Sequence, residues 1–143
     1  MKKIVLAVIC VFVLIACSED SYHYYNPYLP DTQVSLSVNL NLPTYAPLNY
    51  VNNSVIEYSQ GYNGVIIHHS PVGFVAYEAT CSNHTISPNS ALNVRGEIAT
   101  CNHCDRQYFL LTGQPTSETE TSQYHLKPFH VNQQGNILRI TNF

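Results

Sequence analysis

The chain contains little charge, and basic residues are especially scarce. Lys, Arg, Asp and Glu make up 10% of the 143 residues, only six are Lys or Arg, and the formal net charge is -3 at pH 7. Proteins that bind nucleic acid need a basic patch to contact the phosphates. The composition therefore argues against nucleic acid as a partner.

Several motifs that would indicate catalysis or phosphate binding are also missing. The chain has no Gly-x-Ser-x-Gly elbow and no obvious pairing of a nucleophile with a base, so Ser/His/Asp catalysis has no support. A glycine-rich phosphate cradle and internal repeats are absent as well. Beyond the first residues, no long window keeps apolar side chains at the spacing of a helix, which argues against a helical fold.

The residues that are common favour short strands. Tyrosine is abundant, tryptophan is absent, and Val, Thr and Asn are interspersed with Pro and Gly. The length suits one domain with a modest core, and strands spaced about ten residues apart indicate a small all-β sandwich or barrel. The predicted strands cover residues 34–40, 55–58, 65–68, 74–79, 93–99, 107–111, 124–131 with a bend at Pro128, and 137–141.

The first residues are predicted to be a targeting signal. Lys2 and Lys3 precede residues 4–15, which are nearly all apolar and too few to span a bilayer comfortably. The stretch ends in Leu14-Ile15-Ala16-Cys17, which resembles a bacterial lipobox. We therefore expect residues 1–16 to be a lipoprotein signal peptide and Cys17 to be lipidated. The alternative is an ordinary secretory signal with an incidental cysteine.

A tether is predicted to follow, over residues 17–33. Loss of the signal peptide leaves four basic residues against nine acidic ones, a net charge of -5. Ser18-Glu19-Asp20 resembles the export signal of Bacteroidetes surface lipoproteins, although it is equally typical of a solvated linker. Residues 21–31 hold two prolines and predict an extended tether, or a strap laid on the domain. The expected location is the bacterial envelope, with lipid anchorage to the membrane, and the outer membrane or cell surface if Ser18-Glu19-Asp20 is an export signal.

The remaining three cysteines lie in two short motifs. The first knuckle is Cys81-Ser82-Asn83-His84 and the second knuckle is Cys101-Asn102-His103-Cys104, with sixteen residues between them. A thiolate or imidazole three residues from another ligand reaches the same ion when the backbone between them turns tightly. Two such turns brought together complete a four-ligand site.

Further motifs follow a recognisable order, and together they resemble the Rieske-type iron–sulfur domain over residues 34–143. The chain looks most like the Rieske-like lipoproteins of Bacteroidetes. The resemblance implies a small Rieske-like sandwich or barrel with two metal-binding loops at one tip. The matching motifs are Gly64 before an apolar strand, residues 74–81 with His84, Cys101 with Cys104, and residues 108–115, 126–129 and 136–140.

The knuckles depart from the Rieske pattern of Cys-x-His followed by Cys-x-x-His. His84 is three residues after Cys81, and Cys104 stands where the second histidine is expected. The implied metal ligands are Cys81, His84, Cys101 and Cys104, with His103 as an alternative ligand. Asp105 and Arg106 replace the Gly-Ser pair of the family, which puts in doubt the hydrogen bonds that such a serine would supply to the cluster.

Three functions remain open for the knuckles. The resemblance implies a [2Fe–2S] cluster that transfers electrons to a redox partner, without enzyme activity, because no second domain with a mononuclear iron site is present. Three thiolates and one imidazole are also a closed tetrahedral zinc set. Finally, Cys81 could form a disulfide with Cys101 or Cys104, leaving a non-redox structural or binding lipoprotein without a metal.

Other polar residues are interpreted as structural. His68 and His69 are neighbours in a strand and should point to opposite faces, so they cannot easily chelate one ion together. Three single carboxylates on predicted strands are expected on solvent faces. They are Glu57, Glu78 and Glu97.

Overall fold

The computed structural model describes residues 24–117 and 124–143, so the predicted signal peptide, Cys17 and residues 118–123 lie outside the described residues. Nine strands and one 3-10 helix form the described part. Their bounds are β1 (Ser35–Asn39), η1 (Pro43–Asn49), β2 (Ser54–Glu57), β3 (Val65–Ser70), β4 (Gly73–Glu78), β5 (Leu92–Arg95), β6 (Ile98–Cys101), β7 (Gln107–Phe109), β8 (Pro128–Gln134) and β9 (Ile137–Thr141).

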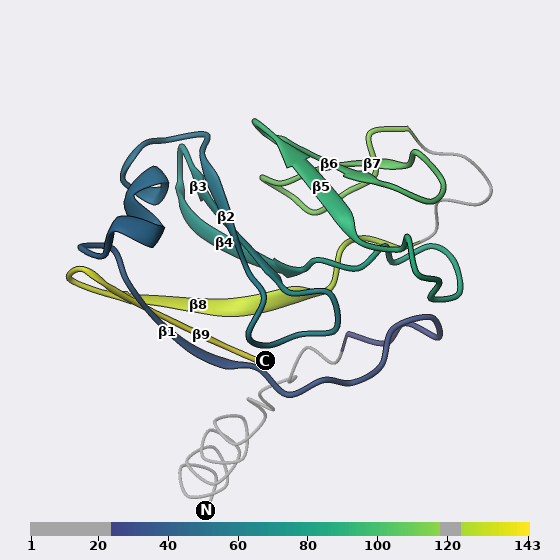
Figure 1. Cartoon of the computed structure of the whole chain (residues 1–143), viewed down its shortest axis with the longest axis horizontal. Helices are drawn as coiled ribbons and strands as arrows, with labels where there is room; N and C mark the ends of the chain where they lie inside the picture. The colour runs from purple at the N-terminus through teal and green to yellow at the C-terminus, as the bar shows by residue number, and fades with distance from the viewer. Residues whose placement is uncertain (1–23, 118–123) are drawn as a thin grey trace, which may run out of the picture.

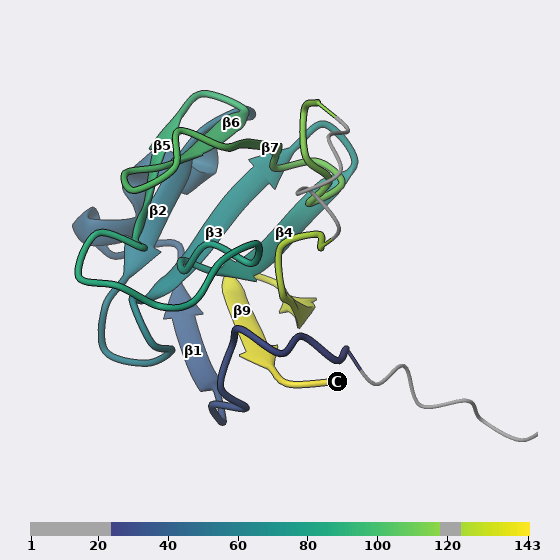
Figure 2. The ribbon, with the colours of Figure 1, turned by 90° about the vertical axis from the view of Figure 1, so that its right-hand side faces the viewer.

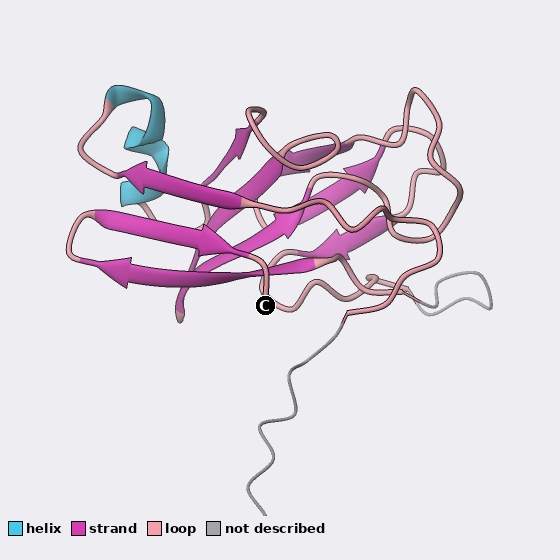
Figure 3. Cartoon of the chain, turned by 90° about the horizontal axis from the view of Figure 1, so that it is seen from below, coloured by secondary structure: helices cyan, strands magenta, loops and turns pink. Residues whose placement is uncertain are grey.

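The strands form two antiparallel sheets, as Figures 1 and 3 show. The large sheet has the order β1-β9-β8-β4-β3-β2, and the small sheet has the order β5-β6-β7. The large sheet curls, and the small sheet lies beside it at one end of the molecule (Figure 1). The expected small all-β domain is therefore confirmed. Within the described ranges, no helix is both long and apolar enough to cross a membrane.

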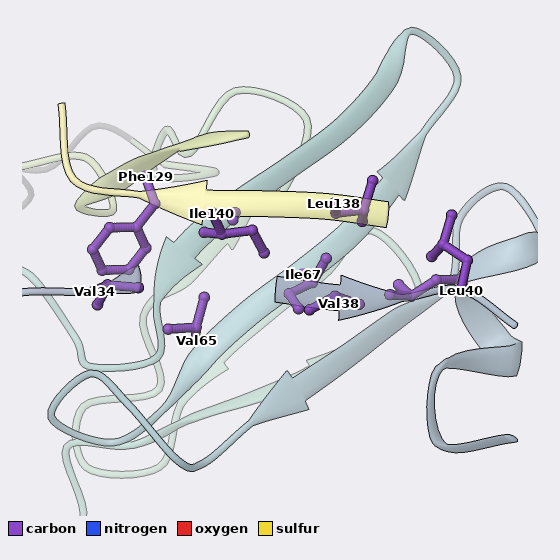
Figure 4. Close-up of a cluster of buried hydrophobic side chains, with 10 residues drawn as sticks. Val34, Val38, Leu40, Val65, Ile67, Phe129, Leu138 and Ile140 are labelled. Carbon is purple, nitrogen blue, oxygen red and sulfur yellow. The ribbon is translucent and has the colours of Figure 1, made fainter. Parts of the chain in front are cut away.

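Two clusters of buried side chains hold the sheets together. The first fills the curl of the large sheet and is drawn in Figure 4; it includes Val38, Val65, Ile67 and Leu138. The second lies between the large and small sheets and includes Ile66. The run Val65-Ile66-Ile67 is thus apolar throughout because β3 has a core on each face. The second cluster also contains Cys81, Cys101, Tyr108 and Leu126, so the knuckles begin in the core.

Two predicted strands were wrong in detail. Residues 93–99 were expected to be one strand, but they belong to a hairpin in which Arg95 pairs with Ile98. Gly96 turns the chain there with φ +58, a left-handed conformation that glycine adopts without steric cost. The strand predicted from Tyr124 begins only at Pro128, because the backbone of Tyr124 bonds to the side chain of Asn83 instead of a neighbouring strand.

Glu78 was expected to face solvent, and this prediction was also wrong. The residue is 1% exposed. Its carboxylate accepts hydrogen bonds from the backbone N–H groups of Tyr62 (3.0 Å) and Asn63 (3.1 Å) and from the hydroxyl of Thr80 (2.8 Å). A carboxylate that accepts three hydrogen bonds can be buried at acceptable cost. Glu78 therefore holds the turn at residues 61–64 against the end of β4, three residues before the first knuckle.

His68 and His69 lie on opposite faces of β3, as predicted. His68 is 1% exposed, and its Nδ1 atom is 2.8 Å from the hydroxyl of Ser54. The Nε2 atom of His68 has no hydrogen-bond partner within the described part of the chain. His69 stacks on Phe74, and its Nδ1 atom lies 2.8 Å from the carbonyl oxygen of Leu48. Both histidines are explained by packing and need no ligand.

Burial of His68 predicts a pH dependence of folding stability. Desolvation lowers the pKa of His68 below its usual 6.5, so the unfolded chain takes up a proton at a higher pH than the native protein does. The stability that the neutral ring contributes is present above about pH 6.5 and is lost as the pH falls toward the lower native pKa. Urea unfolding of His68→Gln between pH 5 and 7 should show a smaller loss of stability with acid than the wild type. His69→Gln is the matched control, and equal slopes for wild type and His68→Gln would contradict this role.

Candidate metal centre

The two knuckles are held side by side by backbone hydrogen bonds. The first follows β4, and the N–H of Cys81 donates to the carbonyl of Ser90 at 2.9 Å. The second begins at the last residue of β6, where the N–H of Asp105 closes the turn onto the carbonyl of Cys101 at 3.0 Å. Asp105 has φ 55, a left-handed conformation that is uncommon for residues other than glycine but that aspartate tolerates better than most. An N–H from Asn102 to the carbonyl of Ala91 joins the second knuckle to the loop that follows the first.

The four predicted ligands meet at this point. One donor atom from each of Cys81, His84, Cys101 and Cys104 lies within 4.8 Å of all the others. The Sγ atoms of Cys81 and Cys104 are 3.8 Å apart, and Nε2 of His84 is 3.3 Å from Sγ of Cys101. Cys81 and Cys101 are buried, His84 is partly buried and Cys104 is exposed, so the group opens to solvent on one side.

His103 does not belong to this donor group. Its side chain is exposed, and its ring packs against the ring of His84 with centroids 4.8 Å apart. The contribution of His103 to the site is its backbone N–H, which donates to Sγ of Cys101 at 3.4 Å. The geometry thus favours Cys104 over His103 as the fourth donor.

Backbone N–H groups also lie close to the cysteine sulfurs, and that of His103 donates to Sγ of Cys101. The N–H of Asn83 lowers the pKa of Cys81, and the N–H groups of His103 and Cys104 lower that of Cys101, in addition to the larger effects of the neighbouring thiol and of burial. The N–H of Arg106 acts in the same direction on the pKa of Cys104. Donors that point at sulfur stabilise the thiolate form and orient it for a metal.

The three thiols strongly influence one another. The pKa of Cys81 is lowered, mainly because the thiol of Cys101 donates a hydrogen bond to it. The same contact is the main reason that the pKa of Cys101 rises to about 12. Burial raises the pKa of Cys104. Repulsion among three adjacent thiolates is relieved by a bound cation, so the donor set fits a metal that prefers thiolate ligands.

Tyr108 and Asn83 support Cys81, and sequence reasoning missed both. The Tyr108 hydroxyl lies 3.2 Å from Sγ of Cys81 and accepts a hydrogen bond from Nδ2 of Asn83 at 2.9 Å. Burial raises the pKa of Tyr108, so its hydroxyl keeps a proton to donate to the sulfur. Asn83 also bonds the backbone N–H and carbonyl of Tyr124 at 2.8 and 2.6 Å. For Asn83, the only indication in the sequence was its position inside the first knuckle.

The spacing of the donors can be compared with the groups that such a set would hold. Around one tetrahedral ion with bonds of about 2.0–2.3 Å, neighbouring donor atoms lie about 3.5–3.8 Å apart. The observed separations of 3.8 and 3.3 Å are close to this value. A [2Fe–2S] cluster places two irons between its ligand pairs, so ligands on different irons are farther apart than ligands on one ion. The residue types suit both groups, and these two of the six donor separations are close to those around one ion.

Comparison with known proteins shows which solved structures share this fold. No protein-family model matches the chain, and no curated protein matches it. A ferredoxin from Sphingomonas yanoikuyae B1 matches 77% of this chain and 100% of its own, with 12% identity and a TM-score of 0.50. A quaternary ammonium Rieske monooxygenase, solved with L-carnitine, matches 76% of this chain but only 31% of its own, with 11% identity and a TM-score of 0.51. At such low identity the likeness concerns the fold, and the predicted Rieske-like fold is confirmed.

The contacts of Tyr108 lead to a prediction about stability. Tyr108→Phe removes the hydrogen bond to Cys81 and the acceptor of one Asn83 bond inside the core, so unfolding should become easier by about 1–3 kcal/mol. Denaturant unfolding of metal-free protein, kept reduced, measures the difference. Tyr58→Phe is the control, because Tyr58 is 76% exposed. Equal losses in the two variants would show that the Tyr108 hydroxyl does not stabilise the first knuckle.

Proposed function

We propose that this protein is a lipid-anchored, Rieske-like metalloprotein that transfers electrons and is not itself an enzyme. The observation that carries the proposal is the convergence of three cysteines and one histidine, from two loops far apart in sequence, at one end of a fold shared with a ferredoxin and a Rieske monooxygenase. Cys81, His84, Cys101 and Cys104 are the proposed ligands. A redox protein is the proposed partner.

The burial of the donors suits an electron carrier. Cys81 and Cys101 reach back into the core, whereas Cys104 and His84 lie toward solvent. A centre held in this way is kept dry on one side and has a short path to a partner on the other. When bound, a [2Fe–2S] cluster would supply a one-electron couple. Its potential would lie below that of a centre with two imidazoles, because a third thiolate adds negative charge.

A single zinc ion is the second candidate, and the donor spacing favours it. All four donor atoms lie within 4.8 Å, and a set of three thiolates and one imidazole is typical of closed structural zinc sites. The ion would then fasten the two loops together, and the protein would act in binding or architecture without redox chemistry. All three thiols are free in the structure, and a disulfide between Cys81 and Cys104 requires movement, because their Sγ atoms, 3.8 Å apart, must approach to about 2.05 Å.

Measurement of metal and acid-labile sulfide tests these alternatives. The full chain, purified without oxygen in detergent, should contain iron and sulfide if it carries a [2Fe–2S] cluster. Zinc without sulfide would replace the electron carrier with the zinc protein. A protein with neither, whose mass rises on reduction as a disulfide opens, would contradict both.

Two histidine variants serve as a matched pair for the metal measurement. His84→Ala removes a proposed ligand, so its metal affinity should fall by more than the 10- to 100-fold typical of losing an outer-shell partner. His103→Ala should keep the metal, because His103 contacts Cys101 only through its backbone N–H. The reverse result would make His103 the ligand.

The proposed lipid anchor would keep the metal centre near the membrane. Cys17 precedes the first described residue, Tyr24, by seven positions, which span at most about 25 Å of fully extended chain. Tyr24 lies next to residues 124–127 at the end of the molecule that bears the knuckles. A membrane-bound redox protein therefore suits this geometry.

Lipidation at Cys17 predicts where the protein is found in its bacterial host. Cys17→Ser should move the protein from the membrane fraction to the soluble fraction and abolish labelling by a fatty-acid probe, because acyl chains supply the anchor. Cys10→Ser is the control and should leave both unchanged. Unlabelled wild-type protein in the soluble fraction would rule out a lipoprotein.

A further inference from the structure

Residues 24–31, here called the strap, lie across the end of the molecule that bears the knuckles. In Figures 1 and 2 this segment is the purple ribbon that precedes β1. It contains no strand or helix, yet it is fastened by side chains. The Tyr24 hydroxyl donates to the carbonyl of His125 at 2.6 Å, and Nζ of Lys127 contacts the carbonyl of Pro30 and the carboxylate of Asp31 at 3.3 and 3.2 Å.

Asn26 joins the strap directly to the first knuckle. Asn26 is only 7% exposed, and its Nδ2 atom donates a hydrogen bond to the carbonyl of Ser82 at 2.8 Å. Nδ2 also lies 3.1 Å from the Tyr24 hydroxyl, while Oδ1 accepts from the N–H of Tyr28 at 2.8 Å. Both ends of the amide are therefore used. Ser82 is fully buried and follows Cys81 in sequence, so its carbonyl would lose a partner in the core if Asn26 were removed.

The first knuckle is held from a second direction by the segment that also holds the strap. Asn83 bonds both backbone groups of Tyr124, and the ring of Tyr124 meets the ring of Tyr28 edge-on at 5.9 Å. The strap, residues 124–127 and the first knuckle thus form one connected network. The strap lies outside the two sheets, so the network is an addition to the β domain rather than a part of its ladders.

We propose that the strap is a component of the metal centre, in which Asn26 acts as a positioning residue for the first knuckle. By fixing the carbonyl of Ser82, Asn26 holds the backbone on which Cys81 and His84 are placed. Groups that orient metal ligands from outside the coordination shell typically change metal affinity 10- to 100-fold when they are removed. The inference rests on the proposed function in one respect, which is that the knuckles bind a metal.

Cobalt binding provides a direct test with the full chain in detergent. Co²⁺ added to reduced, metal-free protein should give a thiolate-to-cobalt absorption band, and an excess of chelator should remove the ion. Asn26→Ala and Asn26→Asp should both lose cobalt about 10- to 100-fold faster than the wild type. The aspartate keeps the acceptor for the Tyr28 N–H and loses the Nδ2 donor to Ser82 and Tyr24, so a similar effect in both variants assigns the effect to Nδ2.

Two further measurements distinguish a positioning role of Asn26 from a purely structural one. Asn53→Ala is the matched control, because Asn53 also bonds backbone carbonyls, at 3.4 and 3.3 Å, in another part of the chain. It should keep cobalt within about twofold of the wild type, since it orients no ligand. Hydrogen exchange of metal-free protein should rise in the peptide containing residues 81–84 of the Asn26 variants and stay unchanged in β8 and β9. If Asn26 variants do not fold, Tyr24→Phe, which weakens the same network, replaces them.

The outcomes distinguish this inference from the proposed function. Wild-type protein without a cobalt band overturns the metal centre and the strap's role in it. A wild-type band with equal cobalt loss in wild type and strap variants overturns the positioning role alone. Faster exchange throughout the domain would show that the strap stabilises the fold in general, and this result would also contradict the proposal.

Discussion

The close approach of three thiols and one imidazole is the constraint on which the candidate metal centre depends. Donor atoms of Cys81, His84, Cys101 and Cys104 lie within 4.8 Å, and the pKa values of the cysteines move in opposite directions because one sulfur is stabilised at the expense of another. Such a group is unfavourable as three free thiolates and favourable around a cation. Neighbouring backbone N–H groups and the hydroxyl of Tyr108 stabilise negative charge on the three sulfurs.

The position of the group is set by the second core cluster rather than by the loops alone. Cys81 and Cys101 pack beside Ile66, Tyr108 and Leu126, so two of the four donors are also core residues. Displacing either sulfur would disturb the packing between the two sheets. The buried carboxylate of Glu78 further anchors the strand that leads to Cys81, because it binds the end of β4 to the turn at residues 61–64.

The shared fold and the donor set answer different questions. Likeness to a ferredoxin and a Rieske monooxygenase concerns the β scaffold, and a fold by itself does not determine chemistry. Chemistry is decided by the donors, where a cysteine replaces one histidine and adds a negative charge. The proposed electron carrier and the proposed zinc protein therefore use the same loops. They differ in whether the knuckles hold one ion or two irons and two sulfides.

The sequence by itself determined the local elements and the candidate ligands. Alternation predicted β1, β-rich runs flanked by turns predicted β3, β4 and β9, and the cysteine spacing predicted both knuckles, because each of these signals lies within a few residues. Only the tertiary structure placed Cys104 rather than His103 beside the other three donor atoms, buried Glu78 and brought Asn26 to Ser82. These outcomes depend on contacts between residues far apart in the chain. The packing of the two sheets determines which of these side chains come into contact, and no local sequence pattern predicts it.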